Sequence, residues 1–259
     1  MHCIFCKADS STSRTAEHII PESLGNIEHM LPPRVVCDGC NNYFARKIEK
    51  PLLDAAYFQL SRFRNSVANK KGRIPAAKGV HLQSATVVEV CKSDEGLSIY
   101  PMNEKDSDKF ARNVLTKKTG SLILPVAPEQ ENDKRLMSRF IGKVAIEALA
   151  QRLIPIEGGQ NEIVYKAELD ELRDYVRWNK GKLDWQFYRR RIYEEEFVFE
   201  ENNCEYEILH EYSFLYTDTR ELYFVVAIWG IEYVINMGDP EIEGYAHWLK
   251  LNDNKSPLM

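Results

Sequence analysis

Two closely spaced pairs of cysteines set the strongest limits on how the N-terminal part of this chain can fold. The pairs are Cys3 with Cys6 and Cys37 with Cys40. The segment between them is rich in Ser, Thr and Pro and lacks periodic apolar residues, so it cannot fold by burying a hydrophobic core alone. Four thiolates at this spacing can close a tetrahedral zinc site. The sequence therefore predicts that these four cysteines bind a structural Zn²⁺.

Apart from the paired cysteines, the sequence has the composition expected of a soluble protein. The chain has 259 residues, enough for one large or two modest domains. No stretch approaches the run of about 18 apolar residues that spans a membrane, and the N-terminus lacks the pattern of a signal peptide. We therefore expect a cytoplasmic protein that does not contact membranes. In the reducing cytosol, paired cysteines are more typical of a metal site than of a disulfide.

Charge is distributed unevenly along the chain, whose net charge is -5. Residues 34–78 contain ten Lys or Arg and three acidic residues, whereas residues 193–259 contain three and fifteen. A basic tract can bind a polyanion even when the whole protein is acidic, although both regions could also be ordinary solvated surface. The candidate contacts to nucleic-acid phosphates are Arg34, Arg46, Lys47 and Lys50.

A polar, basic stretch rich in Gly and Pro divides the sequence at residues 69–79. Before it, apolar residues recur at helical spacing after Cys40, and Pro51 fits the first turn of a second helix. We predict an N-terminal domain at 1–68, a basic linker at 69–79 and a second domain at 80–259.

The second region is predicted to mix helices and strands, so the expected fold class is α+β. A hairpin is expected from 85–90 and 97–100, and amphipathic helices at 132–153 and 168–178. The alternating pattern of 204–216 and 222–236 predicts strands, with Gly230 as a bend or bulge. No motif identifies a ligand, which leaves substrate selection, regulation and assembly open as roles for this region.

Between the two cysteine pairs lies the motif EHIIPESLGN at 17–26, and Asn41 and Asn42 directly follow the second pair. The order CxxC, EHIIPESLGN, CDGCNN resembles the HNH endonucleases of the ββα-metal fold, in the subgroup with a structural zinc. The resemblance covers roughly residues 1 to 55. It implies a β-hairpin carrying an acid–His pair, followed by a helix, which together hold one catalytic divalent ion.

The resemblance also implies roles for single residues. His18 falls on the general base, and Glu17 and Asn41 fall on ligands of the catalytic ion, with Asn42 as a further candidate ligand. Two alternatives stay open on local grounds: Glu17 could be a surface carboxylate, and Asn41 could be the N-cap of the following helix.

The middle Asn of the family motif has no direct counterpart in this chain. The family usually has it a few residues before the second knuckle, where this chain has the sequence LPPRVV at 31–36. Asn26 or Asn42 could take its place. Since that Asn chiefly orders the hairpin carrying the base, the departure affects the loop geometry more than the chemistry.

These residue types suit phosphodiester hydrolysis. A neutral imidazole can accept a proton from water at cellular pH, and carboxylate and amide oxygens are ligands suited to Mg²⁺ or Mn²⁺. We predict a metal-dependent HNH endonuclease that favours DNA, and by analogy a role in bacterial or phage defence or restriction.

The alternative is a non-catalytic zinc-knuckle module that binds nucleic acid or senses a partner. The pair of Glu17 and His18 favours the enzyme, because a purely structural zinc element needs neither residue. A regulatory protein partner and a homo-oligomer both remain open.

Overall fold

The structure is a computed structural model that describes residues 1–69, 71–93, 95–117, 120–126, 133–181, 184–194, 199–201, 204–206 and 209–259. It divides into two compact units. The first unit combines Met1–Leu52 with Asn132–Met259, and the second unit is Leu53–Glu131. The predicted fold class, α+β with an N-terminal zinc-knuckle domain, is confirmed. The division differs from the predicted boundary at 69–79, because the N-terminal segment shares its unit with the C-terminal region.

The stretch predicted as a linker ends within a strand. β3 (Ala77–His81) alternates buried and exposed residues. A Cβ atom added to Gly79 would lie 2.7 Å from the carbonyl oxygen of Ile123, so this glycine permits a close approach of the two backbones. Ala77 also packs with Phe63 in the core of the second unit. The basic stretch with its Gly and Pro residues therefore leads into a β-sheet and does not form a free linker.

The N-terminal segment has the ββα order that the resemblance implies. β1 (Glu17–His18) pairs antiparallel with β2 (Met30–Leu31), and the short helix η1 (Glu22–Leu24) lies between them. α1 (Asp38–Phe44) follows and continues through the π-helical segment η2 (Ala45–Glu49) into α2 (Lys50–Leu53). Pro51 lies in the first turn of α2, but α2 continues α1 and η2 without a break, so no separate second helix starts there. Pro51 has no N–H to bond the preceding turn, and the helix widens into η2 directly before it.

The C-terminal part of the first unit contains the longest helix and a four-stranded antiparallel sheet. Its helices are α5 (Lys134–Leu153), α6 (Gly159–Tyr165), η4 (Ala167–Leu169), α7 (Asp170–Trp178) and α8 (Glu243–Leu251). The strand order is β10 (His210–Tyr216), β11 (Leu222–Ile228), β12 (Ile231–Asn236) and β7 (Phe187–Arg191). A separate ladder pairs β8 (Phe199–Glu201) with β9 (Cys204–Tyr206). The helices predicted at 132–153 and 168–178 are both present, as α5 and α7, and each begins two residues later than predicted. Residue 132 lies outside the described residues.

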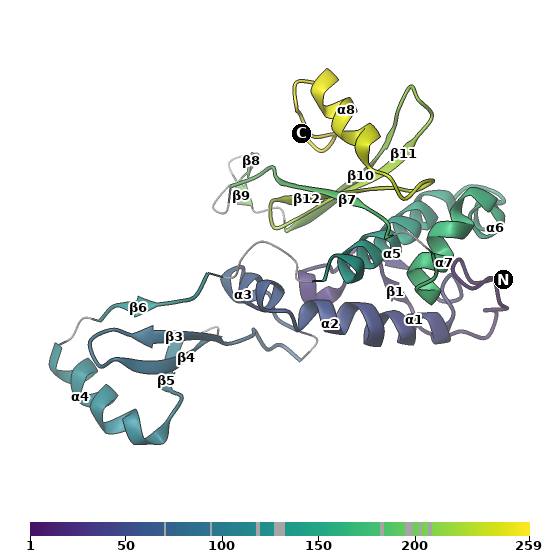
Figure 1. The fold of residues 1–259 in the computed structure, drawn as a ribbon. Helices are drawn as coiled ribbons and strands as arrows, with labels where there is room; N and C mark the ends of the chain where they lie inside the picture. Colours follow the sequence, from purple (N-terminus) through teal and green to yellow (C-terminus); the bar gives the residue numbers. More distant parts are fainter. Residues whose placement is uncertain are drawn as a thin grey trace. The chain divides into compact units, whose positions relative to one another are not determined.

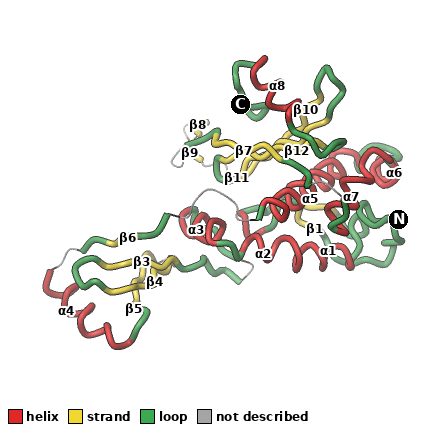
Figure 2. Tube along the Cα trace, viewed as in Figure 1, coloured by secondary structure: helices red, strands yellow, loops and turns green. Residues whose placement is uncertain are grey.

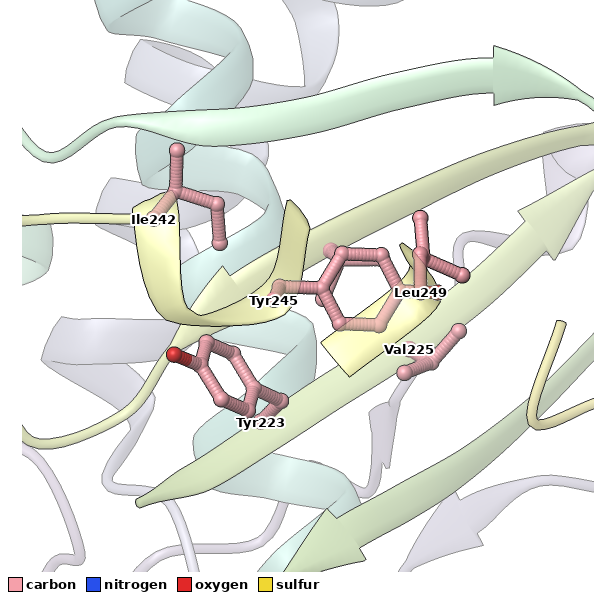
Figure 3. Close-up of a cluster of buried hydrophobic side chains, with 6 residues drawn as sticks. Tyr223, Val225, Ile242, Tyr245 and Leu249 are labelled. Atoms are coloured by element: carbon pink, nitrogen blue, oxygen red, sulfur yellow. The ribbon is translucent and has the colours of Figure 1, made fainter. Parts of the chain in front are cut away.

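This sheet is covered on both faces, with α5 on one and α8 on the other (Figure 1). α8 packs against the sheet through a cluster of buried side chains (Figure 3). The cluster comprises Tyr223, Val225, Val234, Ile242, Tyr245 and Leu249. The predicted single strand at 222–236 is in fact two strands. Trp229 and Gly230 both have positive φ angles, of 49° and 77°, and form the tight hairpin turn between them.

The second unit is a smaller α+β body, with its helices and strands distinguished in Figure 2. Its strands pair antiparallel in the order β5 (Gly96–Pro101), β4 (Thr86–Ser93), β3 and β6 (Leu122–Ile123). The hairpin predicted from 85–90 and 97–100 is confirmed as β4 and β5. Its helices are α3 (Ala56–Arg64), η3 (Glu104–Asp106) and α4 (Ser107–Lys117). Across the described residues of both units, no helix has the length and apolar character needed to cross a membrane.

Candidate active site and zinc centre

The four N-terminal cysteines meet at one point. The sulfur atoms of Cys3, Cys6, Cys37 and Cys40 all lie within 4.8 Å of one another. The sulfurs of Cys6 and Cys37 are 3.6 Å apart, close to the edge of about 3.8 Å that a tetrahedron with Zn–S bonds of about 2.3 Å would have. Cys3 and Cys40 are buried, whereas Cys6 and Cys37 are partly exposed. The geometry fits a structural zinc ion, and these four cysteines can hold it.

The four thiols differ in pKa because each sulfur affects its neighbours. The hydrogen bond with Cys40 lowers the pKa of Cys3 to about 5, whereas burial raises the pKa of Cys6 to about 11. Zinc binds cysteine as the thiolate, so a zinc ion at this site would hold all four sulfurs deprotonated.

Arg177 on α7 adds a cation beside the zinc centre, and the sequence patterns did not indicate it. Its Nε atom donates a hydrogen bond to the sulfur of Cys40 at 3.1 Å. Its guanidinium lies 4.0 Å from the ring centre of Tyr43 and 4.1 Å from that of Trp178. Stacking between two aromatic rings fixes the guanidinium against the thiolate position.

The loop between β1 and β2 is ordered by the side chain of Asn26, which is fully buried. Its amide nitrogen donates to the carbonyl oxygens of Ile20 at 2.6 Å and His29 at 2.9 Å. Its amide oxygen accepts from the backbone N–H groups of Glu28 and His29. Asn42, the other position considered for this role, is exposed on α1. The contacts that order the hairpin therefore belong to Asn26.

His18 lies on β1 and is half-buried, and no hydrogen bond among the described residues involves its imidazole. Asn41 lies on the facing helix α1, where its side-chain amide donates to the carbonyl oxygen of Ala16 at 3.3 Å. The start of α1 thus lies beside β1, in the arrangement of a ββα site. The N-cap of α1 is Cys37, whose sulfur accepts from the N–H of Cys40, so the N-cap alternative for Asn41 is wrong.

Glu17 is buried and ion-paired, so the alternative of a surface carboxylate is wrong. It is 5% exposed, and its Oε1 atom lies 2.7 Å from the Nζ atom of Lys143 on α5. Burial raises the pKa of Glu17, and the attraction of Lys143 acts against that rise.

Lys143 is the centre of a buried charge cluster that the sequence patterns did not identify. Its fully buried Nζ atom also lies 2.7 Å from Glu49 of η2 and 3.0 Å from Glu147, and it donates to the carbonyl oxygen of His18 at 3.1 Å. Burial alone would lower the pKa of Lys143, but the carboxylates of Glu147, Glu17 and Glu49 raise it well above its usual range. Burial likewise raises the pKa of Glu147 well above its ordinary value. Lys143 is therefore held in the charged state.

The four basic residues predicted to contact phosphates are all exposed. Arg46 and Lys47 lie on η2 and Lys50 begins α2, so these three share the helix that follows the zinc knuckle. Arg34 lies just before the second cysteine pair and has a positive φ angle of 79°. Their exposure is what contact with a polyanion requires, but it is equally typical of a solvated helix face.

Comparison with known families identifies the N-terminal segment. Residues 3–56, about a fifth of the chain, match the family described as HNH endonuclease. This segment is therefore an HNH domain, and its four cysteines occupy the positions of a zinc knuckle. Membership of this family suggests nuclease activity and a nucleic-acid substrate. No curated protein and no solved structure matches the chain.

Proposed function

We propose that this protein is a metal-dependent endonuclease that hydrolyses phosphodiester bonds in nucleic acid, with DNA as the preferred substrate. The observation that carries the proposal is an HNH-family segment in which His18 lies on a hairpin strand beside the helix that follows the zinc knuckle. A purely structural zinc element would need neither this histidine nor the buried carboxylate next to it.

In this proposal His18 is the general base. Its imidazole accepts the proton of the attacking water. A bound Mg²⁺ or Mn²⁺ would polarise the phosphate and stabilise charge on the leaving oxygen. Glu17, through Oε2, and the amide oxygen of Asn41 are the proposed ligands, with Asn42 as a further candidate. All are oxygen donors, which is the ligand type that these ions prefer.

The proposal includes a path for the substrate. Arg34, Arg46, Lys47 and Lys50 would contact the phosphate backbone and hold the duplex across the site, without reading its sequence. We place the activity in restriction or antiphage defence. A comparison of plaque formation on cells expressing the wild type or His18→Ala tests that role.

The decisive experiment is a nicking assay on supercoiled plasmid, linear duplex, single-stranded DNA and RNA, with Mg²⁺, Mn²⁺ or a chelator. We expect wild-type protein to nick DNA only with the metal, and His18→Ala to be at least about 100-fold slower. His247→Ala is the matched control, because His247 is exposed on α8. Wild-type activity in a folded, zinc-loaded His18→Ala variant would contradict the proposal, and DNA binding without cleavage by any form would favour the non-catalytic module.

A further inference from the structure

We propose that Lys143 is a positioning residue of the nuclease site, which it completes from outside the HNH segment. The proposal rests on the proposed function and deepens it. Lys143 lies on α5, and its ammonium contacts both members of the acid–His pair: the carboxylate of Glu17 at 2.7 Å and the carbonyl oxygen of His18 at 3.1 Å. Residues 3–56 therefore do not contain everything that places the base.

The strand β1, which Lys143 contacts, is short and has few backbone pairings. β1 is two residues long and makes two pairings with β2. In β1 and directly beside it, the carbonyl oxygens of three alternate residues each accept a hydrogen bond from a side chain. The donors and acceptors are Asn41 to Ala16, Lys143 to His18 and Asn26 to Ile20. Lys143 provides the middle contact, at the base itself.

The helix that carries Lys143, α5, is long and largely buried. α5 is twenty residues long and is buried over most of its length, so Lys143 connects β1 to the core of the first unit. A catalytic group must be held within a fraction of an ångström, and such precision comes from supporting residues on regular elements. A two-residue strand tied to this helix meets that requirement.

General stability is a weaker explanation for the cluster. Burying an ammonium with carboxylates contributes little net stability compared with apolar side chains of similar volume. In addition, three carboxyl groups surround one ammonium, and the Oε1 atom of Glu147 has no hydrogen-bond partner among the described residues. Three buried acidic side chains around one cation are unfavourable as packing, but they hold the ammonium of Lys143 beside Glu17 and His18.

The experiment compares Lys143→Met with Arg139→Met in the full-length, zinc-loaded protein. Arg139 lies one turn earlier on α5, is 7% exposed, and bonds Tyr43 and the carbonyl oxygen of Val176 rather than β1. Both variants remove a buried cation from the same helix. We expect Lys143→Met to lower kcat for plasmid nicking by about 10- to 100-fold with KM for DNA within about twofold, and Arg139→Met to lower kcat by no more than about threefold.

One further variant and one spectrum keep the proposal testable. Lys143→Arg retains the charge and should recover part of the lost kcat. If Lys143→Met does not fold, Lys143→Arg should still be about tenfold slower than wild type, because a guanidinium cannot reproduce the four contacts of the ammonium. In histidine-selective NMR, Lys143→Met should shift and broaden the His18 ring signals and leave the exposed His247 signals unchanged.

The outcomes separate the two proposals. If wild type cleaves and folded Lys143→Met matches Arg139→Met in kcat, the role of Lys143 is refuted while the nuclease stands. If wild type cleaves no substrate with any metal, the nuclease proposal fails. The NMR spectrum then decides the placement of His18 by Lys143: unchanged His18 signals in the variant refute it, and altered signals support it.

Discussion

The zinc end and the hairpin end of the N-terminal segment differ in how much of the chain supports them. The cysteine cluster closes within the segment: Cys6 and Cys37, for example, are 31 residues apart. The loop of the hairpin is ordered locally by Asn26, but the strand that carries His18 is also contacted by Lys143, which lies 125 residues after His18. The four zinc ligands are therefore local to the segment, whereas on our proposal the position of His18 depends also on α5.

Removing a zinc ligand should have the largest effect on folding, because it abolishes the zinc site on which the N-terminal segment depends. Cys37→Ser should lose bound zinc and unfold the N-terminal segment, since the binding energy of a structural zinc ion is also folding energy, on the order of 10 kcal/mol. Zinc stoichiometry and circular dichroism measure the two losses. Cys91→Ser is the control, because Cys91 lies on β4 outside the cluster. A Cys37→Ser protein that keeps stoichiometric zinc would contradict the assigned ligand set.

Asn26→Asp should have the next largest effect, at the hairpin end. The substitution keeps the size of the side chain but replaces its two donated hydrogen bonds with repulsion between oxygens, in a fully buried position. We expect a loss of about 2–3 kcal/mol in the free energy of unfolding, measured by urea denaturation. Asn42→Asp, on the exposed face of α1, should change it by less than about 0.5 kcal/mol. Equal effects of the two variants would remove Asn26 from its role in ordering the loop.

Arg177→Met tests how local the zinc end is. Because Arg177 contacts the sulfur of Cys40 from α7, its loss should weaken zinc binding by about tenfold without unfolding the segment. Competition with a chromophoric chelator measures the affinity. Lys180→Met is a suitable control, since the ion pair of Lys180 with Asp174 is exposed. An unchanged zinc affinity would show that the knuckle needs no support from α7.

The smallest effect is expected at the surface. Asp170 on α7 lies 2.6 Å from Lys7 and 2.5 Å from Arg173. Burial acts to raise the pKa of Asp170, but the hydrogen bonds from Lys7 and Arg173 lower it overall. The folded-state pKa is thus below the unfolded value, so the stabilisation is present at neutral pH and is lost only as pH falls through the folded pKa.

Asp170→Asn should therefore lower the free energy of unfolding by less than about 1 kcal/mol, because the carboxylate is about half exposed. The difference from wild type should stay constant between about pH 6 and 8 and shrink in about 1 M salt. A difference that varied across that pH range would indicate that another group titrates with Asp170.

The contrast between the two ends also explains what could be predicted from the sequence. The knuckle and the motif around His18 were predictable because their residues stand at fixed spacings within 40 positions. The helix at α5 was predictable from its apolar periodicity. The role of Asn26 was one of two open alternatives, since only the loop geometry separates it from Asn42.

Lys143 and Arg177 could not be assigned from spacing, because the contacts that indicate their roles, with His18 and with Cys40, each span more than 100 residues. A weak signal for the cluster exists nevertheless. Lys143 and Glu147 stand four residues apart inside an otherwise apolar helical stretch, where a charged pair is unusual. The unit division was missed for a related reason: composition does not reveal that residues 53–131 are inserted between two parts of one unit.

The 125 residues that separate His18 from Lys143 impose an order on biosynthesis. Lys143 follows the last zinc ligand, Cys40, by about 100 residues, so at translation rates of about 5–20 residues per second the zinc ligands emerge roughly 5–20 s before the residue that anchors the proposed base. A nascent chain stopped near residue 130 should bind zinc but should not cleave DNA, and cleavage by such a chain would contradict this order. On the proposed function, cleavage competence would therefore arise only after α5 has been synthesised.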